Sequence, residues 1–390
     1  MGLLRTYRSV CAVAPFIASI FLLSGCGGLR LQRPVVVQEN DWPTFARAGT
    51  HTDATEESLA VPLKQDWELD IAAGMGTGTP IVVNGTLFVG TLRGELYAFQ
   101  TTDGKRIGWT SLADAIPGSP IINGVIAVVT ASNTRESLIG YDLLEGKVRW
   151  RKPYGDIEVS PLHIEEHIYF GNTRGAFFCV DRISGEQIWQ FELPNNTRLK
   201  GIRSSPAGAD SIIYFGSDDG AVYALEASTG KLRWSTITGG AVIAAPALAN
   251  GTVYAANLDG TVIALNADSG TVRWRFSAGS PVYANVTPVE NLVVFGTTGG
   301  VLYALRAADG SVAWKTDLGS PVNSGAVVAR QTIFVGTLKK FLFALRLSDG
   351  SVTWKTEVNG RIKTAPIIFG GRLYLATDER NIIAFRGTGL

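Results

Sequence analysis

Short runs of apolar residues alternate with clusters of turn-forming residues along most of the chain. Runs such as Thr252-Val253-Tyr254 and Ile263-Ala264-Leu265 have the length and the apolar, partly β-branched content of strands. Gly, Asp, Asn and Ser, which favour tight turns, fill many of the intervals between these runs. The pattern therefore predicts short antiparallel strands joined by hairpins rather than helices.

The strand pattern recurs about every 40 residues. The segment ALNADSGTVRW at 264–274 returns as ALRAADGSVAW at 304–314 and as ALRLSDGSVTW at 344–354. A glycine four residues before the tryptophan of most repeats allows the positive φ of a tight turn. The repeated tryptophans are Trp67, Trp109, Trp150, Trp189, Trp234, Trp274, Trp314 and Trp354. Four strands in each such repeat predict one blade of a β-propeller.

The first and last repeats complement each other. The unit that begins at Pro366 has three strands and no tryptophan, whereas residues 67–71 have the pattern of a fourth strand with no strands before it. Pairing the two removes edges that would otherwise stay exposed. We therefore predict an all-β, eight-bladed β-propeller with four-stranded antiparallel blades at 65–390, closed by an N-terminal strand that completes the last blade. Residues 41–64 are expected to form an N-terminal extension. The seven complete blades begin at Pro80, Pro120, Pro161, Pro206, Pro246, Pro288 and Ala326.

The first 25 residues have the pattern of an export signal. Arg5 and Arg8 provide a positive start, and the run at 10–23 is mostly apolar. The run is short for a membrane span, and small residues follow it closely. Residues 1–25 are therefore predicted to be a signal peptide rather than part of the fold.

The end of this signal, Leu23-Ser24-Gly25-Cys26, resembles the lipobox of bacterial lipoproteins. Cleavage before the cysteine of a lipobox leaves that residue as an acylated N-terminus, so the resemblance implies acyl chains such as palmitate on Cys26 and a lipidated tether at 26–40. The next residue is Gly27 and not the aspartate that retains such proteins at the inner membrane. This implies the outer membrane, with the protein facing the periplasm. The alternative is an ordinary signal peptide with a coincidental cysteine.

Charge and cysteine content bear on nucleic-acid binding and on disulfide bonds. The net charge is +1 and no basic stripe is present, which argues against a nucleic-acid partner. Cys11 leaves with the signal and Cys26 is assigned to the lipid, so Cys179 remains without a partner for an intramolecular disulfide. Cys179 stands where other repeats have alanine, which predicts a buried structural thiol.

Residues for catalysis or metal binding are not evident. His163 and His167 are four apart, but they are predicted to lie on two strands of a hairpin rather than on one helical face. A hard cation would need several oxygen ligands, whereas the segments expected near the axis, 74–78 and 241–245, are small and largely apolar. We expect no catalytic, metal-binding or cofactor-binding residues, and hence a protein that is not an enzyme.

One connection between blades departs from the others in length. Trp189 and Pro206 are 17 positions apart, whereas the other connections to a proline span 11 to 14. Loops that depart from a scaffold often carry binding function. The residues Arg198, Leu199, Lys200, Gly201 and Arg203 combine positive charge with an aliphatic side chain and are the predicted partner-binding residues. The alternative is a longer loop that only contacts solvent.

The repeat Ala-Leu-x-Ala-x-x-Gly-x-x-x-Trp resembles that of the quinoprotein (PQQ-like) propellers over roughly residues 65–386. Together with the lipobox, the tether and the bare eight-bladed ring, it resembles the BamB family of outer-membrane lipoproteins. That resemblance implies a non-catalytic scaffold, without a cofactor, in the machinery that assembles β-barrel proteins in the outer membrane. Its expected partners are a BamA-like β-barrel insertase and other lipoproteins of the assembly complex. The family carries a Leu-Arg-Gly segment in the connection that meets BamA, and Leu199-Lys200-Gly201 is similar to it with Lys in place of Arg.

The same resemblance leaves two other functions open. Residues 41–45 and 50–52 are similar to the opening segment of other secreted PQQ-like repeat proteins, so the chain could be a paralogue of the main BamB protein. One alternative is a scaffold or ligand-binding propeller in another envelope process. The other is a small PQQ-dependent dehydrogenase, which would need a quinone and Ca²⁺.

Overall fold

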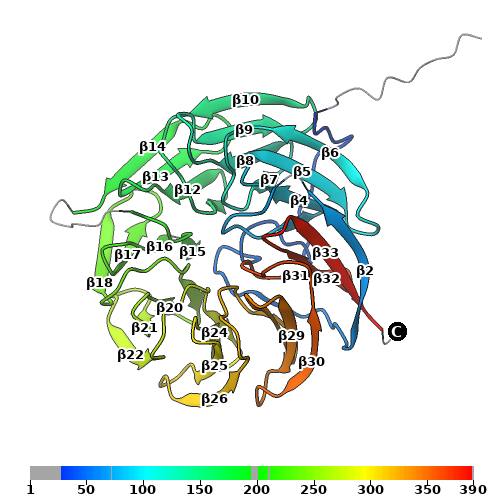
Figure 1. Ribbon diagram of the computed structural model, residues 1–390. Helices are drawn as coiled ribbons and strands as arrows, with labels where there is room; N and C mark the ends of the chain where they lie inside the picture. Colours follow the sequence, from blue (N-terminus) through cyan, green and yellow to red (C-terminus); the bar gives the residue numbers. More distant parts are fainter. Residues whose placement is uncertain (1–27, 72, 195–200, 210, 389–390) are drawn as a thin grey trace, which may run out of the picture.

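The computed structural model describes residues 28–71, 73–194, 201–209 and 211–388, and these residues form strands and turns arranged as a ring (Figure 1). The strands make eight sheets placed around a central axis. No helix in this part of the chain is long and apolar enough to cross a membrane. The predicted all-β, eight-bladed propeller is therefore confirmed.

Each complete blade consists of four consecutive antiparallel strands, the first next to the axis and the fourth at the rim. Blades 1 to 4 are formed by β3 (Ile81–Val83), β4 (Thr86–Gly90), β5 (Glu95–Gln100) and β6 (Arg106–Ser111); β7 (Ile121–Asn123), β8 (Ile126–Thr130), β9 (Leu138–Asp142) and β10 (Lys147–Lys152); β11 (Leu162–Ile164), β12 (His167–Gly171), β13 (Ala176–Asp181) and β14 (Gln187–Glu192); β15 (Ala207–Ala209), β16 (Ile212–Gly216), β17 (Ala221–Glu226) and β18 (Leu232–Ile237).

Blades 5 to 7 follow the same order. They are formed by β19 (Ala247–Ala249), β20 (Thr252–Ala256), β21 (Thr261–Asn266) and β22 (Val272–Ser277); β23 (Thr287–Val289), β24 (Leu292–Gly296), β25 (Val301–Arg306) and β26 (Val312–Asp317); β27 (Val327–Ala329), β28 (Thr332–Gly336), β29 (Phe341–Arg346) and β30 (Val352–Glu357). The proline that opens a blade lies one residue before its first strand, except that Pro288 lies inside β23.

The eighth blade joins the two ends of the ring. It contains β31 (Ile367–Phe369), β32 (Arg372–Ala376), β33 (Asn381–Gly387) and, as its outer strand, β2 (Leu63–Asp70). The pairing of β2 with β33 is antiparallel. This confirms the predicted closure by an N-terminal strand.

The repeated tryptophan and glycine pack against each other across the junction between blades. Trp234 in blade 4 donates from Nε1 to the carbonyl oxygen of Ala267 in blade 5, at 2.9 Å. Gly270, with φ of +69°, lies beneath the indole ring, and a Cβ at this position would lie 2.6 Å from Trp234 Cδ2. The glycine is therefore needed both for its backbone conformation and for its small size.

A second repeated contact fixes the connections between blades. The second strand of most blades ends in glycine, and an aliphatic side chain from the next connection lies directly over it, as Val242 does over Gly216. Val242 is fully buried. This contact, which the repeat pattern alone did not predict, anchors the end of each such connection close to the axis.

The N-terminal segment 28–62 lies along the ring rather than away from it. It starts at the rim of blade 2, pairs at Trp42 with Val82 of blade 1, and reaches blade 5, where Leu248 N–H donates to Thr50 O. It then adds β1 (Ala54–Thr55) as a fifth strand parallel to β27. The predicted boundaries of the signal peptide, tether and extension stay predictions, but residues 29–35 of the expected tether contact blade 2.

Candidate partner-binding face and axial pocket

The connections between blades lie on one face of the ring, together with the turns between second and third strands. We call this the connection face. The N-terminal segment crosses the axis on the other face, where it meets the inner strands of blades 1, 4, 5 and 7. The two faces are therefore chemically different, and the connection face carries the predicted partner-binding residues that the structure describes.

The predicted site is only partly described. Cys26 and the three residues Arg198, Leu199 and Lys200 lie outside the described residues. Gly201 and Arg203 are described, and they form the end of the long connection that leads into β15.

The end of this connection has the same anchoring as the other blades. Ile202 is fully buried over Gly171, and its backbone N–H donates to Asn172 O at 3.0 Å. Gly201 O accepts from Asp218 N–H at 2.9 Å, and a Cβ on Gly201 would overlap the Asp218 carboxylate. Glycine at 201 therefore has a local steric reason, which the sequence did not indicate.

Arg203 forms an ion pair with Asp218 on the neighbouring turn. Arg203 Nε lies 3.1 Å from Oδ1 and 2.9 Å from Oδ2. This hydrogen bonding raises the pKa of Arg203. The Arg203 side chain is 45% exposed and that of Asp218 only 12%, so the cation faces solvent while its partner is largely covered.

Blade 8 carries the equivalent pair on the opposite side of the axis. Lys363 Nζ lies 3.1 Å from Asp378 Oδ2, and Arg361 Nε lies 2.6 Å from the same oxygen. Burial pushes the pKa of Asp378 upward, but hydrogen bonds from the Arg361 backbone and from the Lys363 and Arg361 side chains outweigh it and hold the pKa below its usual value. The matched pairs allow blade 4 to be compared with blade 8 by experiment.

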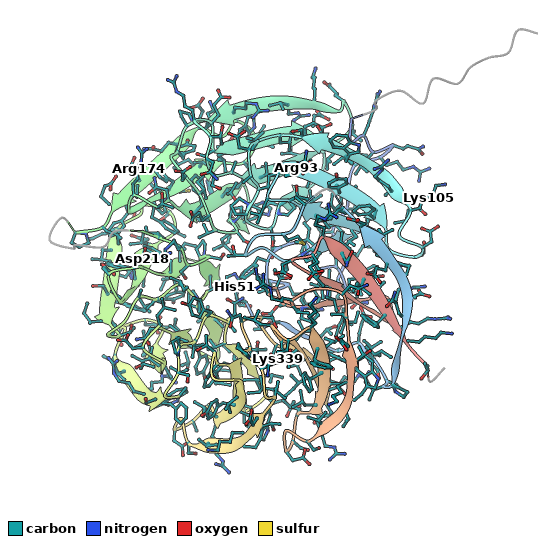
Figure 2. All side chains as sticks on the ribbon, viewed as in Figure 1. His51, Arg93, Lys105, Arg174, Asp218 and Lys339 are labelled. Atoms are coloured by element: carbon teal, nitrogen blue, oxygen red, sulfur yellow. The ribbon has the colours of Figure 1, made fainter. Side chains whose placement is uncertain are left out.

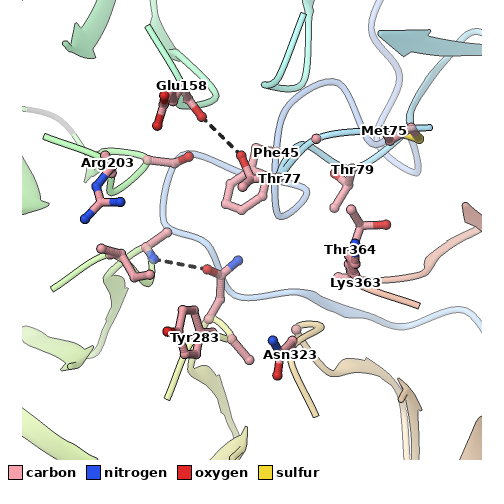
Figure 3. A pocket seen from close by; sticks show the side chains of 18 of the residues that line it. Phe45, Met75, Thr77, Thr79, Glu158, Arg203, Tyr283, Asn323, Lys363 and Thr364 are labelled. Atoms are coloured by element: carbon pink, nitrogen blue, oxygen red, sulfur yellow. Dashed lines mark hydrogen bonds between the residues drawn. The ribbon is translucent and has the colours of Figure 1, made fainter. Parts of the chain in front are cut away.

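Arg203 and Lys363 belong to a ring of eight equivalent positions, one from each connection. These positions differ in chemistry although the scaffold repeats, and they are Thr77, Pro117, Glu158, Arg203, Ile243, Tyr283, Asn323 and Lys363. All of these positions except Pro117 line a pocket at the axis. Figure 3 shows this pocket, with Thr77, Glu158, Arg203, Tyr283, Asn323 and Lys363 labelled around it. Thr77 Oγ1 donates across it to Glu158 O at 3.1 Å.

Hydrogen bonds beneath this ring connect neighbouring blades. The backbone N–H groups of Thr79, Ser119 and Ser160 donate to the hydroxyl oxygens of Ser119, Ser160 and Ser205, respectively, at 2.8 to 3.0 Å. Ala245 N–H donates to Asn285 Oδ1 at 3.1 Å in the same way. These bonds fix the positions of the pocket residues relative to one another.

The pocket has a volume of about 430 Å³ and its floor is part of the N-terminal segment. Phe45 packs with Ala46 and Ala245 and lies in the middle of the ring in Figure 3. His51 contacts Phe45 edge-on, and Figure 2 places it near the axis. The N-terminal segment therefore makes this space a pocket rather than a channel through the propeller.

Two buried titratable groups lie in the same segment. His51 Nδ1 is 2.9 Å from Pro246 O, and burial lowers the pKa of His51 to about 4 despite this hydrogen bond. Asp53 is 1% exposed, and neither of its carboxylate oxygens has a hydrogen-bond partner among the described residues. Burial raises the pKa of Asp53 to about 7.

Three other residues considered in the sequence analysis, His163, His167 and Cys179, lie in strands of blade 3. His163 and His167 lie on neighbouring strands β11 and β12. Cys179 is buried in β13, as predicted, and burial raises the pKa of its thiol to about 12. Among the described residues, no group of three or more His, Cys, Asp or Glu side chains is placed to hold a metal ion.

Sequence comparisons connect the chain with one family. The family described as outer membrane protein assembly factor BamB matches residues 63–167, 175–325 and 298–389. A curated relative, the outer membrane protein assembly factor BamB of Kangiella koreensis, is 25% identical over 127 residues. That match covers 30% of this chain and 32% of the relative, so the chain spans about a third of the length of this curated relative.

Solved structures with the same fold include a BamB protein and two dehydrogenases. BamB from Moraxella catarrhalis has a TM-score of 0.70 at 19% identity, covering 83% of this chain and 99% of that chain. The quinohemoprotein alcohol dehydrogenase from Comamonas testosteroni has a TM-score of 0.73 at 16% identity, covering 90% and 81%. A europium-containing methanol dehydrogenase has a TM-score of 0.73 at 14% identity, covering 87% and 90%. Identities this low show a shared fold alone.

Proposed function

The chain belongs to the family of the outer membrane protein assembly factor BamB, and we propose that it is a non-catalytic scaffold of the machinery that assembles β-barrel proteins in the outer membrane. In this proposal it is held at the periplasmic side of the outer membrane by acyl chains on Cys26. It docks on a BamA-like insertase, alongside the other lipoproteins of the complex.

The observation that carries the proposal is the extent of the family match. Apart from residues 168–174, it extends over all eight blades, from the outer strand β2 to β33. A ring of this kind presents a rigid face, since its blades are connected by buried tryptophans and by the hydrogen bonds beneath the axial ring. Such a face suits a scaffold, because its connections can bind a partner without rearranging the blades.

We assign the docking contact to the long connection at 193–206. Asp218 engages Arg203 through Nε, so the terminal nitrogens of the guanidinium can form a bidentate pair with a carboxylate of the insertase. Arg198, Leu199, Lys200 and Gly201 complete the proposed contact. The covered Asp218 carboxylate orients Arg203 before the partner arrives, which lowers the entropy cost of binding.

The test is capture of partners by the full-length, acylated protein purified from its own envelope in mild detergent. Mass spectrometry should identify the β-barrel insertase in the wild-type sample. Arg198→Glu together with Arg203→Glu should weaken this capture at least tenfold. Lys363→Glu is the matched control, because it reverses the equivalent cation in blade 8 and should leave capture unchanged.

Each result bears on a different part of the proposal. Absence of the insertase from the wild-type sample would contradict the assembly role. Equal capture by the double variant and by Lys363→Glu would leave the assembly role in place and overturn the docking site.

The shared fold of the dehydrogenases favours one further candidate, a small quinoprotein oxidoreductase with its cofactor in the axial pocket. The residues of the pocket do not fit the Ca²⁺ ion that this chemistry needs. Glu158 is the one carboxylate among the described lining residues, and Asn285 Oδ1 already accepts from Ala245 N–H. A hard cation prefers six or more oxygen ligands. Quinone absorbance with Ca²⁺-dependent dye reduction would reverse this assignment.

A further inference from the structure

The junction between blades 1 and 2 lacks the tryptophan contact that most other junctions in the described chain have. Trp189, Trp234, Trp274 and Trp314 each donate from Nε1 to a carbonyl oxygen of the next blade at 2.8 to 2.9 Å. In β6 the register differs by one residue. Gly108, and not Trp109, pairs with Ala98, as Trp234 pairs with Ala224 in blade 4.

The N-terminal segment takes the place of the missing indole. Leu29 is fully buried between blades 1 and 2, and its Cα would lie 3.1 Å from a Cβ on Gly108. The backbone N–H of Leu31 donates to Leu143 O at 2.6 Å. Leu143 occupies the position in blade 2 that Ala267 occupies in blade 5, so the same carbonyl is satisfied by the backbone of the segment instead of by an indole.

Two further hydrogen bonds hold the segment at this junction. Tyr141 donates from its hydroxyl to Leu29 O at 2.7 Å, and Arg30 donates from Nε to Leu144 O at 2.6 Å. The start of the described chain lies beside β6 and β10 in Figure 1. The junction is therefore complete only when residues 29–31 are in place.

Because Gly108 and Leu29 fill the junction instead of a tryptophan, Trp109 lies at the rim of blade 1. Trp109 is 41% exposed and Ile107 is 38% exposed, on the face of β6 opposite to Gly108. Gly108 takes the place that the repeated tryptophan takes in the other outer strands. In each of those seven strands, at least one of the two residues that flank the tryptophan is polar or charged, as Arg273 and Arg275 are in β22. Blade 1 is the exception, with two large apolar side chains in these positions.

Cations surround the same strand. Lys105 and Arg106 are exposed at the start of β6, and Figure 2 shows Lys105 at the outer edge of the ring. Arg30 and Arg33 are exposed in the adjacent N-terminal segment. An indole with nearby cations is the combination found where proteins meet the headgroup region of an anionic bilayer.

The predicted lipid anchor on Cys26 lies close to this strand, because few residues separate Cys26 from Leu29. Leu29 is three residues after Cys26, and three residues of extended chain span roughly 11 Å at most. We propose that the edge formed by Lys105, Arg106, Ile107 and Trp109, which we call the β6 rim, rests on the surface of the bilayer. This inference depends on the acylation of Cys26 in the proposed function, and it adds an orientation: blade 1 meets the membrane and blade 5 points away from it.

The test uses a fluorescent label at the β6 rim. Ile107→Cys in the full-length, acylated protein is labelled with the environment-sensitive dye NBD and reconstituted into vesicles of phosphatidylethanolamine and phosphatidylglycerol. Arg273→Cys, the equivalent position in blade 5, is the matched control. Cys179 is buried and should not react with the dye. We expect a blue shift of the label at 107 and loss of its emission with nitroxide-labelled lipids, and neither change at 273.

The possible outcomes distinguish a wrong assignment of the β6 rim from a wrong assignment of the lipid anchor. If the protein sediments with vesicles and neither label is quenched, the β6 rim does not contact lipid and Trp109 is left for a protein partner. If both labels are quenched equally, the orientation is wrong. If Cys26→Ala sediments with vesicles as wild type does, the lipid anchor is wrong and the inference fails with it.

Discussion

His51 in the N-terminal segment is hydrogen-bonded to the carbonyl oxygen of Pro246 in blade 5, with 2.9 Å between Nδ1 and that oxygen. A carbonyl can only accept, so Nδ1 carries the proton and the neutral ring donates it. Two residues later, Asp53 is buried, and no described residue forms a hydrogen bond with its carboxylate. The N-terminal segment beneath the axial pocket therefore contains two groups whose neutral forms are favoured by burial.

Asp53 should make the free energy of unfolding decrease as pH rises. Burial raises its pKa from 3.8 to about 7, so between these values the folded state binds more protons than the unfolded state. The expected slope is up to about 1.4 kcal/mol per pH unit, and it ends above about pH 7. Asp53→Asn should remove this contribution, so the slope of the free energy of urea unfolding against pH should be more positive in the variant than in wild type between pH 4 and 7. An unchanged slope in the variant would contradict the buried neutral carboxyl.

His51 should act in the opposite direction. Burial lowers its pKa from 6.5 to about 4, so between these values the unfolded state binds more protons and stability increases with pH. The two contributions oppose each other between about pH 4 and 6.5. We expect His51→Gln to make the decline due to Asp53 steeper in this window, and Asp53→Asn to reveal the rise due to His51.

The glycines beneath the indole rings should be more sensitive than other glycines with positive φ. Gly270 has φ of +69° and lies beneath Trp234, whereas Gly251 has φ of +66° and open space within 4 Å of the position that a Cβ would take. Gly251→Ala should cost about 1–2 kcal/mol, the cost of the left-handed conformation alone. Gly270→Ala should cost more, because the indole must also move. Equal losses in urea unfolding would show that the close contact has no effect.

Two tryptophans of the same repeat should differ in their contribution to stability. Trp234 is buried and hydrogen-bonded to Ala267 O, so Trp234→Ala should destabilise the protein by about 3–5 kcal/mol. Trp109 lies outside its junction, and Trp109→Ala should cost about 1 kcal/mol or less. Thermal unfolding compares the two directly. A large loss for Trp109→Ala would show that its contact with Tyr97 is a structural one.

Gly201→Ala should weaken docking without unfolding the ring. Its Cβ would overlap the Asp218 carboxylate and displace the group that orients Arg203. Capture of the insertase should decrease several-fold, while the melting temperature changes little. Arg361→Ala at the matching position of blade 8 should not reduce capture. A full loss of stability in Gly201→Ala would show a structural role for this glycine instead.

The repetitive part of the fold could be predicted from the sequence, because each blade repeats the same turn and packing residues. Trp67 without preceding strands was sufficient to predict the closure with β33. The interval of five residues between Gly104 and Trp109, instead of four, already marks the altered register of β6, but it does not say what fills the junction. Leu29 and Asp53 lie in a segment without a repeat, so their contacts with distant blades have no periodic pattern to reveal them.

The candidate site was less predictable for a similar reason. The length of the connection marked Gly201 and Arg203, but the partner of Arg203 is a turn residue, Asp218, in the following blade. The axial pocket depends on residues from seven of the eight connections and on Phe45 from the N-terminal segment. These residues are about 40 positions apart in the sequence, so they can be recognised as neighbours only when the arrangement of the blades around the axis is known.

The closure of the ring sets a condition on the order of events in biosynthesis. β2 is among the first strands to be synthesised, yet its hydrogen-bonding partner β33 is the last. Both β2 and the side of blade 1 that packs against blade 8 must therefore wait until nearly the whole chain has been translated, and translocated if it is exported. Until then the nascent chain exposes unpaired strands that can aggregate, which makes it a natural client for a holding chaperone.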